Sequence, residues 1–379
     1  MKFVIAGAGI RGKKLQKALS LYGIKVTAFI DNDKNKWEKM IQGIPCFPID
    51  YFATQAKDCI VLISPVNASD LHMALLQYYE NVLNPELTKA LLNGSYIAGY
   101  DDFYPIGHYY SLYPNAAEVC ELPDYASLDE SGLMEIPGIN LNYEVQREYL
   151  NSMVQLYPQI LRWDCPDESS DNYRFRIDNP AFTGGDIVAL YCMLNIIKPK
   201  RWIEVGSGWT SALTLDVNEF CFSNKMELTF IEPYADVLRK ITKASDHINL
   251  IEKGLQDIEE DFFDQLGEGD VLFIDSTHIS KTHSDVNYLF FNILPRLKSG
   301  VIIHLHDIFF PFEYPNAWIK QGFVLNELFL LRSFLQYNNS FEIIYFQNMM
   351  EKIHRNEMES AWPFPGRSIH GGSFWMRKK

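Results

Sequence analysis

Two apolar runs between residues 270 and 308 each end beside an acid and a histidine. VLFI is followed by Asp275, with His278 close behind it, and VIIHL is followed by His306 and Asp307. Ionised carboxylates are costly to bury without a partner, so acids at the ends of two buried strands indicate a function. Because the carboxyl ends of parallel strands meet at one edge of a sheet, we expect these four side chains to share a crevice there.

Each acid has a simpler explanation when it is taken alone. Asp is a preferred N-cap residue, so Asp275 and Asp307 could each begin the helix that follows its strand. Capping does not explain why both acids have an imidazole beside them, and we therefore favour an active site. His304 shares a strand face with the histidine two residues on, and we expect it to be a hydrogen-bonded core histidine. His283 and Asp285 suit helix capping better than catalysis.

A glycine turn lies upstream, in IEVGSGWTS at residues 203–211. Glu204 is inside the strand that leads into this turn, and Glu232 ends the following strand in FIEPY. This pattern suits a cofactor without a pyrophosphate. The turn would pass near an amino-acid carboxylate, Glu232 would accept from two ribose hydroxyls, and Gln256 and Asp257 could hold an adenine amino group. S-Adenosylmethionine has these parts. The predicted cofactor-binding residues are Glu204, Gly206, Ser207, Gly208, Glu232, Gln256, Asp257 and Asp275.

A second glycine-rich turn, GAGIRG, lies near the N-terminus. It follows the strand KFVIAG and opens a helix, and Asp31 closes the next strand. This context is typical of dinucleotide binding, in which glycines let the backbone approach a phosphate and the acid binds ribose hydroxyls. The alternative is a fold kept for packing with an empty pocket, since the unit is short and has no obvious catalytic partner. The predicted second nucleotide site comprises Gly7, Gly9, Gly12 and Asp31.

Strand and helix signals alternate in two parts of the chain, residues 1–85 and residues 171–379. Between them, residues 86–170 are rich in tyrosine, glycine, proline and acids, with helical periodicity towards the end. Strand, helix and strand in this order indicate parallel sheets. We therefore expect an α/β fold with two Rossmann-like doubly wound sheets: a nucleotide-binding domain at 1–85, a connector with helices at 86–170 and a larger domain at 171–379.

The composition of the chain restricts the classes of molecule that we expect it to bind. The 379 residues carry a net charge of −14 with no long basic run, which argues against nucleic acid and an anionic membrane surface. No apolar run approaches the ~20 residues of a membrane span. The N-terminal apolar stretch reads as a buried first strand rather than a signal peptide. Six cysteines without CxxC spacing suit a reduced interior, so we expect a cytoplasmic protein. The sequence is compatible with a homo-oligomer.

From about residue 170 onward, the chain resembles the class I S-adenosylmethionine-dependent methyltransferases. The phrases IEVGSG, FIEPY, FIDSTH, SDVNYLF, HDIFFPFEYP and GGSFWMRK are similar to those of a bacterial branch of this class, and the match covers over half the chain. The N-terminal stretch from IAGAGIRGKKLQKAL to AFIDND resembles, more loosely, the small nucleotide-binding domains attached to sugar-modifying enzymes. The resemblance implies that residues 171–379 form a methyltransferase domain.

Related class I enzymes that methylate sugar hydroxyls hold a divalent metal between acids at the ends of the fourth and fifth strands. A histidine close after the first acid is their general base. By position, the resemblance implies Asp275, His306 and Asp307 as ligands of Mg, Mn or Fe, and it implies His278 and Asp275 as catalytic residues. That family pattern usually has two acids at the fifth strand. In this chain a histidine, His306, stands at the first of these two positions, and an imidazole ligand shifts the metal preference away from Mg.

The resemblance thus implies an O-methyltransferase that acts on a sugar hydroxyl, with a glycan or a small nucleotide-sugar-derived molecule as acceptor. Such a hydroxyl must lose its proton as the new bond forms, which a metal and a histidine can assist. An iron-dependent oxygenase is an alternative, but it leaves Glu204 and Glu232 without a use. A nucleotide-sugar oxidoreductase that uses the N-terminal unit is another, but a Tyr-Lys or Cys partner is missing. A non-catalytic binding protein comes last.

Overall fold

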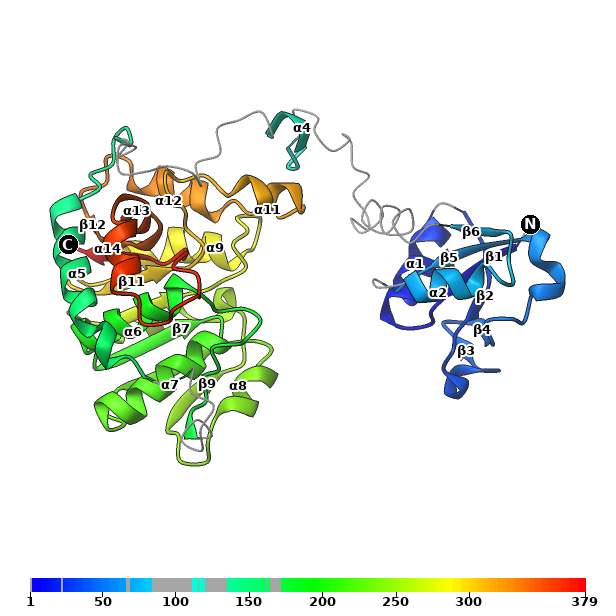
Figure 1. Ribbon diagram of the computed structural model, residues 1–379, viewed down its shortest axis with the longest axis horizontal. Coiled ribbons are helices and arrows are strands. Elements are labelled where there is room, and N and C mark those ends of the chain that lie inside the picture. The colour runs from blue at the N-terminus through cyan, green and yellow to red at the C-terminus, as the bar shows by residue number, and fades with distance from the viewer. Residues whose placement is uncertain are drawn as a thin grey trace. The chain divides into compact units, whose positions relative to one another are not determined.

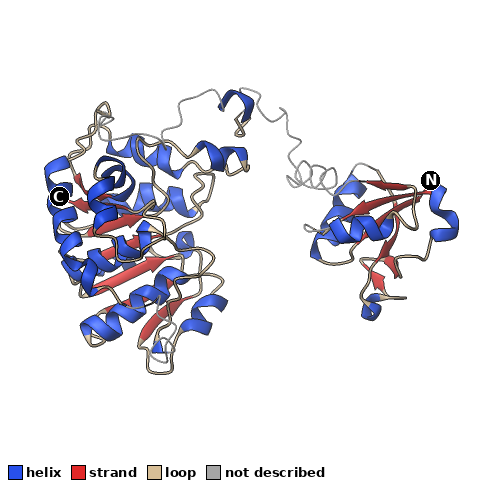
Figure 2. Cartoon of the chain, viewed as in Figure 1, coloured by secondary structure: helices blue, strands red, loops and turns tan. Residues whose placement is uncertain are grey.

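A computed structural model of the chain divides it into two units, Met1–Ser111 and Leu112–Lys379. Each unit has its own sheet with helices on its faces (Figures 1 and 2). The predicted α/β class with two doubly wound sheets is therefore confirmed. The structure describes residues 2–21, 23–65, 69–83, 111–114, 116–119, 135–161, 163 and 172–379.

The first unit contains a six-stranded sheet in the order β3-β4-β2-β1-β5-β6. All its neighbouring strands are parallel except the short hairpin β3–β4. Apolar side chains cover both faces, as continuous runs such as FVIA and CIVLI require. The elements are β1 (Lys2–Ala6), α1 (Ile10–Leu21), β2 (Val26–Ile30), β3 (Met40–Ile41), β4 (Ile44–Phe47), β5 (Cys59–Ile63), α2 (Ser69–Leu75) and β6 (Asn81–Leu83).

The second unit contains a seven-stranded sheet in the order β12-β13-β11-β10-β7-β8-β9. From β11 to β9 neighbouring strands are parallel, whereas β13 runs antiparallel to both β11 and β12. The strands are β7 (Arg201–Val205), β8 (Glu227–Ile231), β9 (Ile248–Ile251), β10 (Val271–Ile274), β11 (Ile302–Leu305), β12 (Phe341–Phe346) and β13 (Phe374–Lys378). The strand order reverses between β7 and β10, and at such a switch point open α/β sheets bind their ligands.

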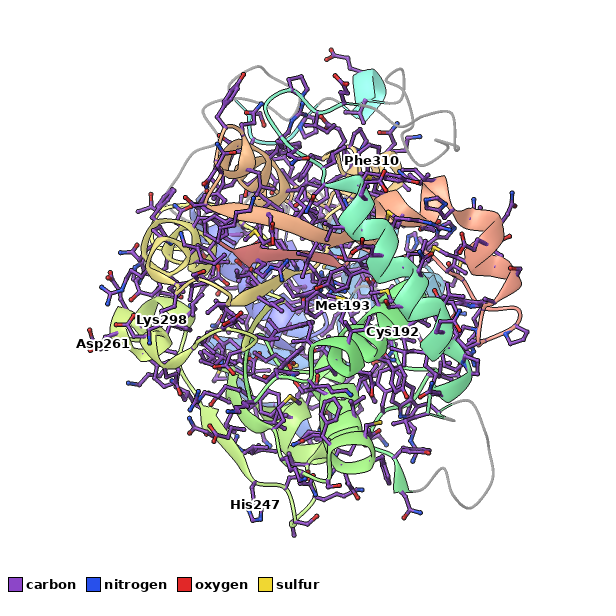
Figure 3. All side chains as sticks on the ribbon, turned by 90° about the vertical axis from the view of Figure 1, so that its left-hand side faces the viewer. Cys192, Met193, His247, Asp261, Lys298 and Phe310 are labelled. Atoms are coloured by element: carbon purple, nitrogen blue, oxygen red, sulfur yellow. The ribbon has the colours of Figure 1, made fainter. Side chains whose placement is uncertain are left out.

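Helices cover this sheet, and α6 is buried along most of its length. Figure 3 shows Cys192 and Met193 of α6 in the interior, while His247, Asp261 and Lys298 lie at the surface. None of the described helices is long and apolar enough to cross a membrane. The helices are α4 (Ala116–Val119), α5 (Tyr143–Leu156), α6 (Gly185–Ile197), α7 (Trp209–Phe222), α8 (Asp236–Ile241), α9 (Asp285–Tyr288), α10 (Leu294–Arg296), α11 (Asn316–Lys320), α12 (Glu327–Leu335), α13 (Gln347–Ile353) and α14 (Arg355–Ser360).

Helix α5 lies in the second unit, although the sequence assigned its residues to the connector. Its preceding residue Asn142 donates a side-chain hydrogen bond to the carbonyl of Ile343 in β12 at 2.9 Å. Gln146, which is buried, accepts one from the backbone N–H of Phe346 at 2.8 Å. The apolar stripe of α5 thus packs on β12 and is part of the core. Most of the remaining predicted connector, residues 86–110 and 120–134, lies outside the described residues.

His304 lies in the core, as expected. It is fully buried, its ring stacks on Phe273 with centroids 3.8 Å apart, and its Nε2 is 3.0 Å from the Ser373 hydroxyl. Burial lowers the pKa of His304 well below its ordinary value. A ring held in this way faces the sheet interior, so His304 is not available to an iron site of the oxygenase alternative.

Because each unit has its own core, we predict that a chain beginning at residue 112 folds alone. It should bind S-adenosylhomocysteine with the dissociation constant of the full chain, as titration calorimetry would measure. Circular dichroism of the truncated protein is the control for folding. A folded truncation that no longer binds would show that the first unit contributes to the cofactor site.

Candidate active site

The four side chains expected at the ends of β10 and β11 meet there. His278 Nε2 is 3.4 Å from Asp275 Oδ1 and 3.7 Å from Asp307 Oδ2. His306 Nδ1 is 3.2 Å from Asp307 Oδ1 and 3.8 Å from Asp275 Oδ1. Two imidazoles therefore lie around the same pair of carboxylates, at the carboxyl edge of the sheet.

Two further acids, which the sequence analysis did not single out, complete this cluster. Glu327, the first residue of α12, is fully buried, and its Oε2 is 2.8 Å from His278 Nδ1. Asp186, in the first turn of α6, places Oδ2 3.5 Å from His306 Nε2. At that distance His306 Nε2 has no hydrogen bond, so the contact is an ion pair only. An acid that opens an otherwise apolar helix, as in NELFLLRSFL, is the signal that could have found Glu327.

The acids hold protons on both rings. Burial lowers the pKa of His278, but hydrogen bonds to Asp275 and Glu327 outweigh it and raise this pKa to about 10. Burial is likewise outweighed at His306, whose pKa the charges of Asp307, Asp275 and Asp186 raise well above its ordinary value. In return, the His306 charge holds the pKa of Asp307 below its usual range in spite of burial. The cluster is therefore a network of ion pairs.

Two residues of the cluster have left-handed backbone conformations, with φ of 58° at His278 and 59° at Asp307. Such angles are uncommon outside glycine, and the surrounding structure must hold them. Gly372 lies against one of them, since a Cβ there would be 2.9 Å from the Asp307 Cα. A Cβ on Gly371 would be 2.7 Å from Asp186 Oδ1. The two glycines before β13 thus allow this segment of the chain to pack closely against both Asp186 and Asp307.

The glycine turn after β7 meets the cluster through its backbone. Gly206 has φ of 81°, and a Cβ on it would lie 1.9 Å from the carbonyl oxygen of Asp275. Glu232 is fixed at the same place, because its two oxygens accept from the backbone N–H groups of Ser207 at 3.0 Å and Tyr234 at 2.8 Å. Two cavities of about 470 and 490 Å³ open here, and Gly206, Glu232 and Asp275 line both.

The other predicted cofactor residues divide into two groups. Ser207 and Gly208 line the first cavity, and Gln256 lines the second. Asp257 is exposed and lines neither. Glu204 is fully buried and also lines neither cavity.

Glu204 instead fixes the first turn of α7. Its carboxylate accepts hydrogen bonds from Trp202 Nε1 at 2.9 Å and from the hydroxyls of Thr210 and Ser211 at 2.7 and 2.5 Å. Burial raises the pKa of Glu204 to about 7 against the effect of these donors. Asp285 has a similar supporting role, since it accepts from the Thr277 N–H at 3.0 Å and from the Thr277 hydroxyl at 2.6 Å.

In the first unit, the predicted nucleotide-site residues lie where β1 and β2 end: Gly7 and Gly9 follow β1, Gly12 is in α1, and Asp31 follows β2. A Cβ on Gly12 would be 1.9 Å from the carbonyl oxygen of Gly7, so the turn requires glycine there. Asp31 accepts from the Ala8 N–H at 2.7 Å and from Lys36 Nζ at 3.0 Å. Burial alone would raise the pKa of Asp31, but these partners lower it. At Gly9, by contrast, a Cβ would meet nothing within 4 Å.

Comparison with known proteins identifies the second unit. Residues 203–308 match the model of a family described as a methyltransferase domain. An uncharacterized protein of Archaeoglobus fulgidus is 32% identical over 168 residues, which cover 44% of this chain and 74% of that protein. The second unit therefore contains a methyltransferase domain. It is an S-adenosylmethionine-dependent methyltransferase, and the matched span includes the glycine turn, Glu232, Asp275 and Asp307.

Solved methyltransferase structures are also similar to this methyltransferase. Methyltransferase FkbM from Methylobacillus flagellatus KT is 15% identical with a TM-score of 0.41, covering 90% of this chain and 85% of that one. The SAH-bound methyltransferase PaMTH1 from Podospora anserina is 14% identical with a TM-score of 0.35, covering 65% of this chain and 100% of that one.

Glu204 provides a pH-dependent test of this geometry. Its pKa is raised in the folded state, so the unfolded chain releases the proton near pH 4.5 and the folded chain near pH 7. Stability should therefore fall as pH rises through this window, by about 3 kcal/mol. Glu204→Gln should lack this fall, because its amide can accept from Trp202 and donate to both hydroxyls. Urea unfolding of the second unit at pH 5 and pH 7.5 measures the difference.

Glu227→Gln is the matched control, since that carboxylate is exposed at the opposite end of the neighbouring strand. Equal pH dependence of the wild type and Glu204→Gln would contradict the assignment of this fall to Glu204.

Proposed function

We propose that this methyltransferase transfers a methyl group to a hydroxyl of a sugar, in a glycan or in a nucleotide-sugar-derived precursor. The observation that supports it best is the His278–Glu327 pair. Glu327 holds one ring nitrogen at 2.8 Å, and the other nitrogen is directed towards Asp275 and Asp307, which line the cavities next to the glycine turn. A hydroxyl acceptor needs such a base, because it must lose a proton as the new bond forms.

The crevice fits S-adenosylmethionine. Ser207 Oγ is buried without a hydrogen-bond partner among the described residues, so its hydroxyl is unused, and a Cβ on Gly208 would meet nothing described within 4 Å, so Gly208 leaves room beside the turn. We assign the amino-acid part to this turn, the ribose hydroxyls to Glu232 and the adenine side to Gln256. Glu204 and Asp257, which the sequence placed in the same set, we assign to supporting and surface positions.

Bound S-adenosylmethionine supplies a methyl group on a sulfonium, whose C–S bond breaks with its electron pair on sulfur as the acceptor oxygen attacks. We assign to His278 Nε2 the removal of the acceptor's proton. Glu327 keeps the ring oriented by holding Nδ1, and it stabilises the imidazolium that results. Asp275, Asp307 and Glu327 all face this ring and favour its protonated form. Turnover should therefore increase as pH rises from neutral towards 10, because more of the ring is then free to accept a proton.

A divalent metal at Asp275, His306 and Asp307 has less support. Among the described residues, no group of three or more His, Cys, Asp or Glu side chains is arranged to hold a metal ion. His306 is instead paired with Asp186, Asp275 and Asp307, whose charges raise its pKa well above its ordinary value. We derive no step through a metal. Elemental analysis of the purified protein for Mg, Mn and Fe tests directly whether these residues hold a metal.

We predict that Glu232→Ala weakens S-adenosylmethionine binding about 10- to 100-fold, because hydrogen bonds to a charged acceptor contribute ~1.5–3 kcal/mol. Titration calorimetry on the full chain measures the change. Asp257→Ala is the control, since its exposed carboxylate lines neither cavity. The cofactor assignment fails if the two variants bind alike, and the methyltransferase chemistry fails if the wild type does not bind.

We predict that His278→Ala lowers turnover by ~10²–10⁴-fold while leaving cofactor affinity and metal content unchanged. The assay follows release of S-adenosylhomocysteine with a panel of sugars and glycans as acceptors. The increase of turnover with pH should disappear in the variant. If turnover of His278→Ala stays near that of the wild type, or still increases with pH in the same way, the base assignment is wrong.

A further inference from the structure

A third cavity lies on the far side of His306 and Asp307 from the glycine turn. It has a volume of about 370 Å³, within the range of small-molecule sites. Ala181, His306 and Asp307 line both this cavity and the neighbouring one at the turn. A molecule bound here can therefore present an atom to the ion-pair cluster while the rest of it lies away from the cofactor.

One wall of this cavity is aromatic. Phe309 and Trp318 meet edge to face with centroids 5.1 Å apart, and Tyr314 lies nearly parallel to Trp318 at 6.4 Å. Trp318 is in α11, is only partly buried and lines the cavity, so part of its apolar ring is within reach of a ligand. Such a surface suits the C–H face of a saturated ring, which packs on an aromatic ring without any charge.

The lining of this cavity also includes a carboxylate with one unused oxygen. Glu351 of α13 is 2% exposed, and its Oε1 is held by His370 Nδ1 at 2.5 Å. Its Oε2 has no hydrogen-bond partner among the residues that the structure describes. A buried acceptor without a donor costs free energy, so the carboxylate has one oxygen left for an O–H or N–H group of a ligand.

Charge restricts that ligand further. Four carboxyl and three basic side chains line the cavity, so positive and negative groups nearly balance. Phosphate binding requires an excess of donors and positive charge, and this lining does not have one. The charge of Glu351 itself is already matched by His370 and by Arg355, 3.7 Å away. The balance favours a neutral donor, which a hydroxyl provides, over an ammonium group.

We propose that this cavity binds the acceptor as a neutral, polyhydroxylated ring, with one face against Trp318 and a hydroxyl other than the methylated one donating to Glu351 Oε2. The inference rests on the proposed methylation of a sugar. It makes Glu351 a determinant of which hydroxyl lies beside His278, because anchoring one hydroxyl fixes the direction in which the others point.

The test is saturation-transfer NMR on the full chain with S-adenosylhomocysteine present. The probes are methyl α-D-glucopyranoside, methyl α-D-mannopyranoside and methyl α-L-rhamnopyranoside, with cyclohexylamine and methyl phosphate for comparison. We expect at least one glycoside to bind. Glu351→Gln should weaken the binding of that glycoside about 10-fold or more. The single amide oxygen of Gln would accept from His370, which leaves no acceptor for the sugar hydroxyl.

Trp318→Leu should weaken the binding of the same glycoside, because the aromatic ring on which the sugar packs is lost. This second variant keeps the test valid if Glu351→Gln is unstable. Glu227→Gln is the control, and equal S-adenosylhomocysteine affinity shows that each variant is folded. Glycoside binding that neither variant alters would overturn this cavity assignment and leave sugar methylation standing. Binding of cyclohexylamine or methyl phosphate alone, or of no probe, would overturn both.

Discussion

The buried ion-pair network at the ends of β10 and β11 is the interaction on which the site depends. An unpaired charge in such a place costs several kcal/mol, so each imidazolium needs acids on both of its nitrogens. His278 meets this need with Glu327 on one side and the strand-end acids on the other, and His306 meets it with Asp186 and Asp307. The first turns of α12 and α6 are therefore tied to the sheet edge by charge as well as by packing.

The strand-end part of this network could be predicted from the sequence. Continuous apolar runs such as VLFI and VIIHL indicate parallel strands buried on both faces, and parallel pairing places whatever follows them at one edge. Asp275, His278, His306 and Asp307 could be brought together on that basis alone. Asp186 and Glu327 could not be placed there, because both reach the edge from helix starts. Glu327 could be noticed only as an acid that opens an apolar helix. Nothing local in a helix start tells which strand end it will face.

The sequence pattern was less informative where the direction of a side chain decides its role. Glu204 is two residues after Trp202, so strand alternation places both on one face, and there Trp202 donates to it. Because Glu204 is close in sequence to the glycine turn, the pattern suggested that it contacts a ligand. Its side chain instead lies on the strand face that packs against the first turn of α7. Gln256 and Asp257 are neighbours in one short turn, and only the first lines a cavity. Spacing located these residues, and the backbone geometry decided their surroundings.

The place of β13 in the sheet has a consequence for the order in which the protein becomes functional during synthesis. β13 follows β12 in the chain, yet it lies between β12 and β11, and within the described part of the chain β12 pairs with no other strand. Until the ribosome has made residues 371–378, β12 has no strand to pair with, and the Asp186 carboxylate lacks the backbone N–H groups of Gly372 and Ser373 that it accepts from. The parallel strands can assemble earlier, because domains form from the N-terminal side as they emerge. A nascent chain stalled before this point would carry the glycine turn but an incomplete charge cluster, so the roles that we propose for the turn and for the cluster would become available one after the other.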